Sequence, residues 1–437
     1  MNKNFKQTKL CETPEGWDIQ AIADLPIEII DGDRGLNYPK KDEFKKQGFC
    51  LFLSTKNVPG EHFDFTEADF INEERDRLLR KGKLKKEDIV LTTRGTVGNI
   101  AYYHEQIPYE HIRINSGMVI IRNMGDKFDT GYLCHLLKSP IVKQQYLSFA
   151  TGSAQPQLPI RDINKIRLTV PSILEQRAIA KILSDLDDKI ELNHRMNKTL
   201  ESIVQATFKR WFVDFEFPDE HGNPYKTSGG KMTDSDLDEI PDGWTVKEIS
   251  DCGEIVCGKT PPTVDKDNYG NDLFFITIPD MRGQAFVIKT ERKLSKKGAS
   301  TQNKKELPAL TICVSCIATP GLVSLTSAPS HTNQQINSIV CNKNISPFFM
   351  YYTMLYKSEE IKTMGLGGTA TLNLNTGNFA RIKIVVPEKT ITDAFHKTAT
   401  PFMEKILSNL KENESLYIIR GSLLPRLMSG KIRLGKN

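Results

Sequence analysis

The sequence predicts an α+β protein with two globular domains of mixed α/β structure, separated by two long antiparallel helices that form a coiled coil. Three observations support this prediction: the length of 437 residues, an internal repeat, and two long helical runs. A chain of this length is too long for one compact core, so two domains of typical size are expected. The repeat relates the two halves and predicts pseudo-twofold symmetry.

The two halves match in order along most of their length. A Pro-acid-Gly-Trp turn stands near the start of each half, at residues 14–17 and 241–244, and a strand is expected after each turn. The next matching pieces are apolar runs at 51–54 and 274–277, basic runs at 80–86 and 292–297, and Ile-Asn-Ser at 114–116 and 336–338. The match ends with two segments of equal length, 151–171 and 367–387.

A helical run follows each of the matched prolines, Pro171 and Pro387. Apolar residues three and four apart form one seam along each run, which favours pairing of the two helices. The helix-pairing residues are predicted to be Ile179, Ile182, Leu186, Asn193 and Leu200 with Phe402, Ile406, Asn409 and Leu416, and Met196, Ile203, Phe395 and Ile419 extend the same faces. Helices of roughly 40 residues reach about 60 Å, and buried asparagines would fix their register and direction. The alternative is two helices buried separately, each in its own domain.

The prolines also set the expected boundaries: domains at 1–171 and 215–387, and helices at 172–214 and 388–437. A formal net charge of +5 is only a mild preference for polyanions. Eight irregularly spaced cysteines and an N-terminus without an apolar stretch predict a cytoplasmic protein with reduced thiols. The uncharged segment 307–330 is rich in Pro, Ser and Thr, so it predicts a pair of buried strands rather than a membrane span.

Several pieces of the chain resemble the specificity subunits of type I restriction-modification systems, and the likeness covers almost the whole chain. The pieces are 151–157, 166–171 leading into 174–177, 258–261 with 278–281, 332–335, and the tail 423–432. One departure is that Ile391-Thr392-Asp393 stands where the first half has Leu174-Glu175-Gln176. The resemblance therefore does not predict that both helices begin alike.

This resemblance implies two target-recognition domains, each of which reads one half of a bipartite, asymmetric DNA site. The helices would set the unread gap and dock two methyltransferase subunits, with restriction subunits as further partners and no membrane. It implies a chain that is non-catalytic on its own but needed for both adenine methylation and restriction. No metal or cofactor is expected in this chain, and the complex would use S-adenosylmethionine, Mg²⁺ and ATP through other subunits. A rigid spacer is expected on physical grounds, because two separated half-sites can be read together only if the two domains are held at a fixed distance and angle.

The candidate DNA-binding residues are loop residues with amide, hydroxyl or guanidinium groups, glycines that admit close backbone approach, and the basic runs. In the first domain they are Ser54, Thr55, Lys56, Lys83, Lys85, Lys86, Arg94, Gly95, Gly98, Gln155 and Gln157. In the second they are Lys259, Thr260, Asp280, Arg282, Lys293, Lys296, Lys297, Gln334 and Gln335. The basic runs are predicted to contact phosphates because their position recurs in both halves; the alternative for each residue is an ordinary solvated surface.

A different class of function is a stand-alone Mg²⁺-dependent restriction nuclease with duplicated DNA-recognition domains. Pro279-Asp280 and Glu291-Arg292-Lys293 have the spacing of acids that bind Mg²⁺ together, but the first half has no counterpart. A third possibility is a scaffold whose helices bind protein only. A methyltransferase acting alone would need a glycine-rich cofactor loop and an Asn- or Asp-Pro-Pro-aromatic motif, and Asn223-Pro224-Tyr225 has only part of this. Cys313 and Cys316 lack the second ligand pair of a zinc site, so buried thiols are expected.

Overall fold

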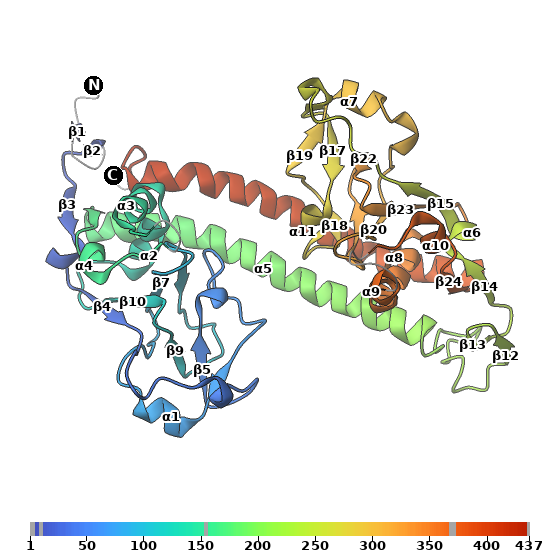
Figure 1. The fold of residues 1–437 in the computed structure, drawn as a ribbon, viewed down its shortest axis with the longest axis horizontal. Helices are drawn as coiled ribbons and strands as arrows, with labels where there is room; N and C mark the ends of the chain where they lie inside the picture. Colours follow the sequence, from blue (N-terminus) through green and yellow to red (C-terminus); the bar gives the residue numbers. More distant parts are fainter. Residues whose placement is uncertain (1–4, 8–11, 153–155, 367–372, 435–437) are drawn as a thin grey trace. The chain divides into compact units, whose positions relative to one another are not determined.

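A computed structural model describes residues 5–7, 12–152, 156–366 and 373–434 (Figure 1). By their contacts the residues form two compact units: unit 1 comprises 1–189 with 416–437, and unit 2 comprises 190–415. Two helices of 40 residues each, α5 (Ile173–Phe212) and α11 (Lys389–Met428), contribute one part to each unit. Each unit therefore contains a globular part and a pair of helix segments.

Unit 1 is built on two sheets whose central strands are buried. The main antiparallel sheet has the order β4 (Ile27–Asp31), β10 (Met118–Asn123), β7 (Ile89–Thr92), β8 (Ile100–Tyr102). The second has the order β6 (Phe70–Ile71), β5 (Cys50–Leu53), β9 (Ile112–Ile114), with β5 parallel to β9. The other elements are the pairs β3 (Asp18–Ala21) with β11 (Arg167–Val170) and β1 (Phe5–Gln7) with β2 (Glu12–Pro14), helices α1 (Glu73–Leu78), α2 (Thr130–Lys138), α3 (Pro140–Phe149) and α4 (Ile160–Ile163), and 3-10 turns η1 (Ile22–Asp24), η2 (Lys41–Glu43) and η3 (Thr55–Asn57).

Unit 2 repeats this plan with one strand more in each sheet. Its main sheet has the order β15 (Gly253–Cys257), β23 (Ile336–Cys341), β20 (Ile312–Ser315), β21 (Val323–Thr326), β18 (Phe286–Val287). The second has the order β16 (Tyr269–Gly270), β19 (Arg292–Leu294), β17 (Leu273–Ile276), β22 (Ser330–Thr332), with β17 parallel to β22. The other elements are the pairs β14 (Thr245–Glu248) with β24 (Lys383–Val386) and β12 (Met232–Ser235) with β13 (Asp238–Pro241), helices α6 (Ile249–Cys252), α7 (Lys296–Ser300), α8 (Pro347–Tyr356), α9 (Ser358–Leu366) and α10 (Thr376–Ala380), and 3-10 turns η4 (Lys266–Asn268), η5 (Ile278–Met281) and η6 (Asn303–Lys305).

The repeat predicted from sequence is confirmed at its ends and in its first strands. The backbone N–H of Trp17 donates to Pro14 at 3.0 Å and that of Trp244 donates to Pro241 at 3.1 Å, and a strand follows each turn. Strands β5 and β17 occupy the two matched apolar runs. The segment 307–330 contains the antiparallel buried strands β20 and β21, as predicted.

Two predicted correspondences in the middle of the repeat are wrong. Asn115 follows strand β9, whereas Asn337 lies inside strand β23; the counterpart of Asn115 is Asn333, which follows β22. The basic runs also differ in place. Leu84 bonds to β9 through Ile112 and Leu307 bonds to β22 through Ser330, so the run at 80–86 corresponds to the residues before Leu307, while 292–297 forms β19 and α7. Short residue matches misled because the loops differ in length.

The two long helices begin and end at equivalent residues, since 173 and 389, like 212 and 428, differ by the same 216 positions as Pro171 and Pro387. Within unit 2 their segments are antiparallel and joined by buried asparagines. The amide of Asn193 donates to Asn413 at 2.9 Å, and that of Asn409 donates to Asn197 at 2.8 Å. The predicted residues Asn193 and Asn409 therefore do not pair with each other. Each pairs with an asparagine on the opposite helix, Asn413 or Asn197, which lies one turn after the predicted residue of that helix.

Burial along the helices follows a slightly different face from the predicted one. Ile179, Asn193, Ile406 and Asn409 are buried, whereas Ile182, Leu186, Leu200, Phe402 and Leu416 are partly buried. The prediction was wrong at Ile203 and Ile419, which are 43% and 45% exposed. On α5, Val204, one position after Ile203, is the buried residue instead. An unsupercoiled helix drifts against a seven-residue repeat, which explains such slips over ten turns. Among the residues described, no helix combines the length and apolar character needed to cross a bilayer.

Candidate nucleic-acid interface

Five loops of unit 1 meet at one end of its sheets; residues 32–36, 54–57, 93–98, 115–117 and 151–157, as far as described, are called here the first loop cluster. Backbone hydrogen bonds hold them together. Asn115 donates to Leu53 at 2.9 Å, Thr93 donates to Gly117 at 2.8 Å, and Gly95 donates to Pro156 at 3.3 Å. The cluster collects the predicted residues Ser54, Thr55, Lys56, Arg94, Gly95, Gly98 and Gln157. Gln155 lies outside the described residues.

The equivalent loops of unit 2, residues 258–264, 277–282, 316–321 and 333–335, are called here the second loop cluster. Lys259 donates through its backbone to Thr332 at 2.9 Å, and Asn333 donates to Ile276 at 3.2 Å. The Thr260 hydroxyl donates to the Gln334 side-chain oxygen at 2.7 Å. This cluster collects the predicted residues Lys259, Thr260, Asp280, Arg282, Gln334 and Gln335.

The backbone of the two clusters is the same where the loops are tightest. A Cβ on Gly32 would lie 2.2 Å from the backbone oxygen of Asn115, and a Cβ on Gly258 would lie 2.2 Å from that of Asn333. Only glycine fits at either position, because such an approach leaves no space for a side chain. The Asn115 and Asn333 side chains each accept from the backbone N–H two residues later, at 2.9 and 3.1 Å.

Their exposed side chains differ at almost every position, so the shared backbone carries different chemistry. The first cluster presents Arg34, Lys56 and Arg94, and the second presents Lys259 and Arg282. Within the part of the chain that the structure describes, only Arg34 of these five cations pairs with a carboxylate, Asp31, at 3.0 Å. Cations without a carboxylate partner on a shared loop surface are suited to phosphate contacts.

The Arg34 side chain was missed by the sequence analysis, as was Ser116. One Arg34 nitrogen donates to the Ser116 backbone oxygen at 3.4 Å, so both belong to the first loop cluster. Arg34 is two residues after Gly32, as Thr260 is two residues after Gly258. The available signal was the glycine directly after a strand in both halves, Gly32 and Gly258, of which the sequence analysis singled out only Gly258, as part of the segment 258–261.

Asp280 has a structural task that accounts for its place in the second loop cluster. Its carboxylate accepts from the backbone N–H and hydroxyl of Thr277, at 2.8 and 2.7 Å, and from the Glu291 N–H at 2.9 Å. Asn57 caps the equivalent turn of unit 1, where it accepts from the Ser54 N–H at 2.9 Å. The equivalent of Asp280 in unit 1 is therefore an asparagine, so the acid pair has no acidic counterpart at this turn, and nothing supports the nuclease alternative.

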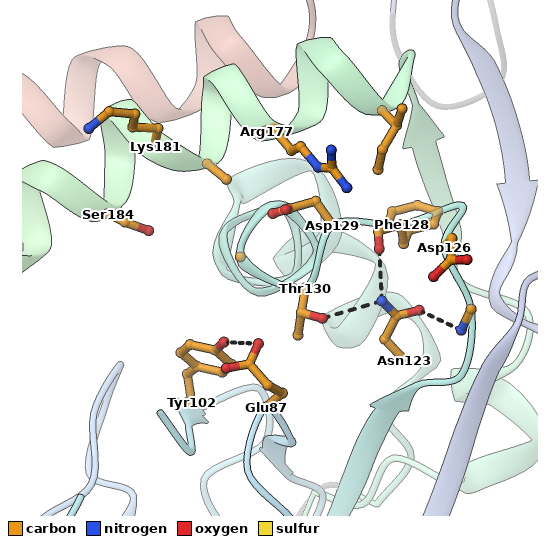
Figure 2. A pocket seen from close by; sticks show the side chains of 14 residues that line it. Glu87, Tyr102, Asn123, Asp126, Phe128, Asp129, Thr130, Arg177, Lys181 and Ser184 are labelled. Carbon is orange, nitrogen blue, oxygen red and sulfur yellow. Dashed lines mark hydrogen bonds between the residues drawn. The ribbon is translucent and has the colours of Figure 1, made fainter. Parts of the chain in front are cut away.

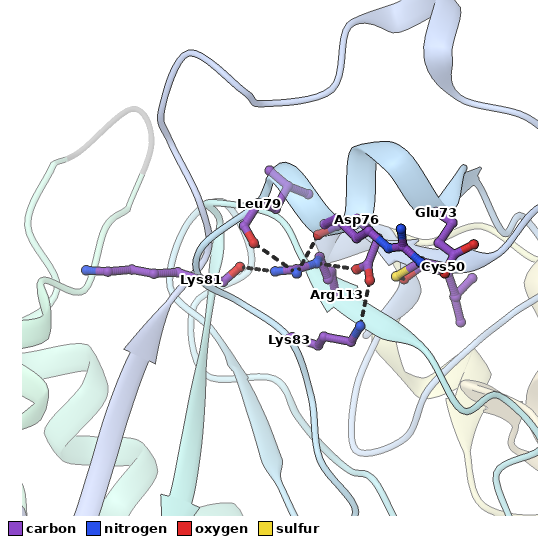
Figure 3. Close-up of polar contacts among 9 residues, drawn as sticks. Cys50, Glu73, Asp76, Leu79, Lys81, Lys83 and Arg113 are labelled. Carbon is purple, nitrogen blue, oxygen red and sulfur yellow. Dashed lines mark hydrogen bonds and ion pairs between the residues drawn. The ribbon is translucent and has the colours of Figure 1, made fainter.

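Some lysines of the basic run at 80–86 form hydrogen bonds and ion pairs within their own unit. Figure 3 shows Asp76 between Lys83 and Arg113, which approach its carboxylate at 2.5 Å each, while Arg113 also bonds the backbone of Leu79 and Lys81. Burial alone would raise the pKa of Asp76, but the bonds from Lys83 and Arg113 hold it below its usual value. Lys83 therefore braces α1 and β9 rather than standing free for a phosphate.

The other basic residues fall into two groups. Lys86 donates to the Ile107 backbone oxygen at 2.9 Å, Lys297 pairs with Asp265 at 3.0 Å, and Lys293 stands over the Phe274 ring. By contrast, Lys85 and Lys296 are exposed, and no ion pair of theirs occurs among the described residues. Of the six lysines predicted in the basic runs, Lys85 and Lys296 are therefore the two that are exposed and not engaged in the contacts described above.

A polar cavity of about 460 Å³ lies at the other end of the unit 1 sheet, between α2 and the start of α5. Figure 2 shows the Tyr102 hydroxyl donating to Glu87, at 2.5 Å, on one wall, and Arg177 and Lys181 on the opposite helix. Its charged lining consists of the acids Glu87, Asp126 and Asp129 and the bases Arg177 and Lys181. The loop-cluster residues Thr93 and Gly117 lie at one end of the antiparallel strands β7 and β10, and the cavity residues Glu87 and Asn123 lie at the other end. The cavity is therefore not part of the candidate interface.

The cysteine pair in the second domain and the possible metal ligands bear on whether the chain holds a metal. Cys313 and Cys316 are buried and free, and burial raises their pKa values to about 12 and about 11. No group of three or more His, Cys, Asp or Glu side chains within the described ranges is arranged to hold a metal ion. Two equivalent loop clusters on duplicated domains are the arrangement of a protein with two recognition surfaces.

Comparison with known proteins agrees with this class. The family described as "Type I restriction modification DNA specificity domain" matches residues 14–202 and 241–414. The HindI specificity subunit of Haemophilus influenzae is 35% identical, covering 92% of this chain and 98% of its own. The MjaIX specificity subunit of Methanocaldococcus jannaschii is 25% identical, with 98% of this chain and 96% of its own covered. The chain belongs to the family of type I restriction-modification specificity subunits, whose role is DNA recognition and not catalysis.

A solved structure supports the fold independently of sequence. The S subunit of the type I restriction-modification system from M. genitalium superposes with a TM-score of 0.60 over 98% of this chain and 97% of its own, at 16% identity. At this identity the likeness concerns the fold alone.

Proposed function

We propose that the two loop clusters read the two halves of a bipartite, asymmetric DNA site. The recognition domains are residues 1–171 and 215–387, and the helices 172–214 and 388–437 set the unread gap. The observation that carries the proposal is the doubling of one loop framework with different side chains. An identical framework would present either cluster to a duplex in the same way, while different side chains would select different bases.

The base-reading candidates are the cluster residues whose side chains combine donors and acceptors. Gln334 is exposed and held by Thr260, so its amide is presented in a fixed orientation. Gln157, Ser54 and Thr55 take this role in the first loop cluster. Lys56, Arg94, Lys259, Arg282, Lys85 and Lys296 contact phosphates in this proposal, and Gly95 and Gly98 let the backbone approach.

The partners are double-stranded DNA, two methyltransferase subunits docked on the helices, and restriction subunits, in the cytoplasm. The chain brings no cofactor of its own, and S-adenosylmethionine, Mg²⁺ and ATP act in the other subunits. The family membership supports this division of labour, because a specificity component recognises the site for both adenine methylation and restriction.

Mapping of methylated adenines in the source genome gives the site and the first test. The proposal expects two separated parts with different sequences. Purified complex should bind this site in preference to a scrambled one as salt rises, and one base pair added to the gap should reduce its affinity to that of a single half-site. Methylation of one continuous short motif would contradict the proposal.

Two substitutions separate base reading from phosphate contact. Gln334→Ala should weaken binding about 10- to 100-fold and relax discrimination in one half-site only. Lys56→Ala should weaken binding to all sequences alike and lower the slope of log affinity against log salt by about 1. Lys127→Ala is the control, because this exposed lysine lies beyond the opposite end of β10. Equal losses in Lys56→Ala and Lys127→Ala would remove Lys56 from the interface.

A further inference from the structure

The two most exposed large apolar side chains of the described residues occupy equivalent loops. Leu36 is 105% exposed and Val264 is 95% exposed, and the next, Leu174, is 75% exposed. Leu36 follows the tight glycine Gly32 in the first loop cluster, and Val264 follows Gly258 in the second. A single exposed leucine needs no explanation, but the recurrence of a fully exposed aliphatic side chain in the equivalent loop of both domains does.

Hydrogen bonds fix the conformation of both loops, so the exposure of Leu36 and Val264 follows from the fold. In the first, the Asp33 carboxylate accepts from the N–H groups of Gly35 and Arg80, each at 2.8 Å, and Tyr38 donates back to Gly35 at 3.0 Å. Arg34 fastens the turn to the Ser116 backbone. Leu36 therefore stands at the tip of a braced turn with nothing of its own unit against it.

The second loop is braced by different groups to the same end. The Tyr269 hydroxyl donates to the Pro261 backbone oxygen at 2.9 Å, and the Asn268 amide donates to that of Pro262 at 3.1 Å. Lys259 anchors its start and Asp265 caps the following turn η4. Val264 therefore projects from a pinned backbone, as Leu36 does.

The surroundings select a partner that is both anionic and locally apolar. Arg34 and Lys40 lie near Leu36 in sequence, and Lys259 and Lys266 lie near Val264. The neighbouring acids are engaged within their own units, since Asp33 accepts from Gly35 and Arg80 and Asp265 pairs with Lys297. In a DNA duplex the apolar group that a side chain meets among phosphates and base edges is the thymine C5-methyl in the major groove. Leucine is among the side chains that insert between bases, but valine is not. Val264 therefore favours contact over insertion, and Leu36 in the equivalent loop is assigned the same role.

We infer that Leu36 and Val264 are specificity residues that contact thymine methyl groups, one in each half-site. The inference rests on the proposed function and gives it a chemical content: an aliphatic side chain contacts one thymine methyl group in each half-site. Discrimination at that position comes from the methyl group rather than from hydrogen bonds.

The test uses the full chain in its complex with the methyltransferase subunits and the site mapped by adenine methylation. Each thymine of the site is replaced in turn by deoxyuridine, which removes only the methyl group. For the wild type, one substitution in a half-site should weaken binding about fourfold, the value of one buried methyl or methylene group. Leu36→Ala should weaken binding to the thymine site by a similar factor and show no further loss with deoxyuridine at that position.

Val264→Ala should behave in the same way for the other half-site and leave the first unaffected. Met124→Ala is the matched control: this side chain is 61% exposed and lies at the far end of β10 from the first loop cluster. It should keep the wild-type deoxyuridine profile.

Three outcomes would overturn the inference. The first is an unchanged deoxyuridine profile in Leu36→Ala and Val264→Ala. The second is a 2-aminopurine signal at one base step that brightens on wild-type binding but not with Leu36→Ala, which would indicate insertion. The third is loss of methyltransferase-subunit assembly without a change in the profile. If the wild type did not prefer the mapped site at all, the proposed function itself would fail.

Discussion

In each unit the globular part packs on the helix segments, but unit 1 does so through ion pairs and unit 2 through aromatic and apolar side chains. In unit 1, Arg420 on α11 donates to Asp187 on α5 at 2.9 Å and also pairs with Glu61, which Lys143 approaches at 3.0 Å. In unit 2 the equivalent positions, 216 residues away, are Met403 for Asp187 and Val204 for Arg420, and both are buried. The unit 1 residues Glu61, His135, Lys143, Asp187 and Arg420 are together called here the ionic joint.

The aromatic joint of unit 2 consists of Val204, Phe208, Phe212, Phe349, Tyr352, Phe395 and Met403. Asp129 caps α2 and Ser346 caps α8, so His135 and Tyr352 are equivalent, six residues after each cap. His135 lies 3.9 Å from Asp187, and the Tyr352 hydroxyl donates to the Met403 sulfur at 3.5 Å. One architecture therefore tolerates either chemistry at the same joint, and only the ionic one depends on charge and pH.

The largest effect is expected in the aromatic joint. The Phe212 ring contacts those of Phe208, Phe349 and Phe395, with centroids 4.9 to 5.2 Å away. Phe212→Ala should lower the free energy of unfolding of unit 2 by about 3–5 kcal/mol, because a buried aromatic leaves a cavity. Hydrogen exchange of α8 peptides measures this, with α2 peptides as the internal control. Equal loss of protection in α2 would show that the units do not unfold independently.

A smaller effect is expected in the ionic joint. Arg420 is 18% exposed at its side chain, so Arg420→Ala should cost about 2–3 kcal/mol, somewhat below the value for a fully buried ion pair. The loss arises mainly because Asp187 is left without its cation. Burial would raise the pKa of Glu61, whereas Arg420 and Lys143 hold it low. The loss of Arg420 should therefore raise the pKa of Glu61.

The double change Asp187→Met with Arg420→Val installs the residues of unit 2 in the ionic joint. It should recover most of the stability lost in Arg420→Ala, since apolar groups of suitable volume replace buried ion pairs without loss in several proteins. Hydrogen exchange of α2 peptides is the measurement. A double variant as unstable as Arg420→Ala would mean that the two joints are not interchangeable.

The sequence predicted the duplication and the long helices because these depend on local spacing. It did not predict the ionic joint, whose members come from a loop and from helices α2, α3, α5 and α11. The same limit applies to the loop clusters: Arg94 and Gln334 were found as polar loop residues, but Arg34 needed the fold to bring it beside Ser116. Lys83 was predicted to be available because nothing in its own segment reveals Asp76.

The smallest effect concerns pH and distinguishes the two joints most directly. Burial lowers the pKa of His135 to about 3, and Lys138 and Arg420 act in the same direction. Its folded-state pKa is below the usual 6.5, so its contribution to stability is complete above pH 6.5 and is lost progressively as the pH falls toward 3. Between pH 7.5 and 5.5 the ionic joint should lose about 1–2 kcal/mol.

His135→Gln provides the control, since glutamine does not titrate and can still bond to Ser184, which lies 3.1 Å from the His135 ring. Burial raises the pKa of Asp187, so that acid opposes the loss only at lower pH. In unit 2, burial also lowers the pKa of His331 on β22, so the comparison is made within unit 1, by hydrogen exchange of α2 corrected for the intrinsic effect of pH. If the wild type and His135→Gln lost protection equally, the charge of His135 would not explain the pH dependence.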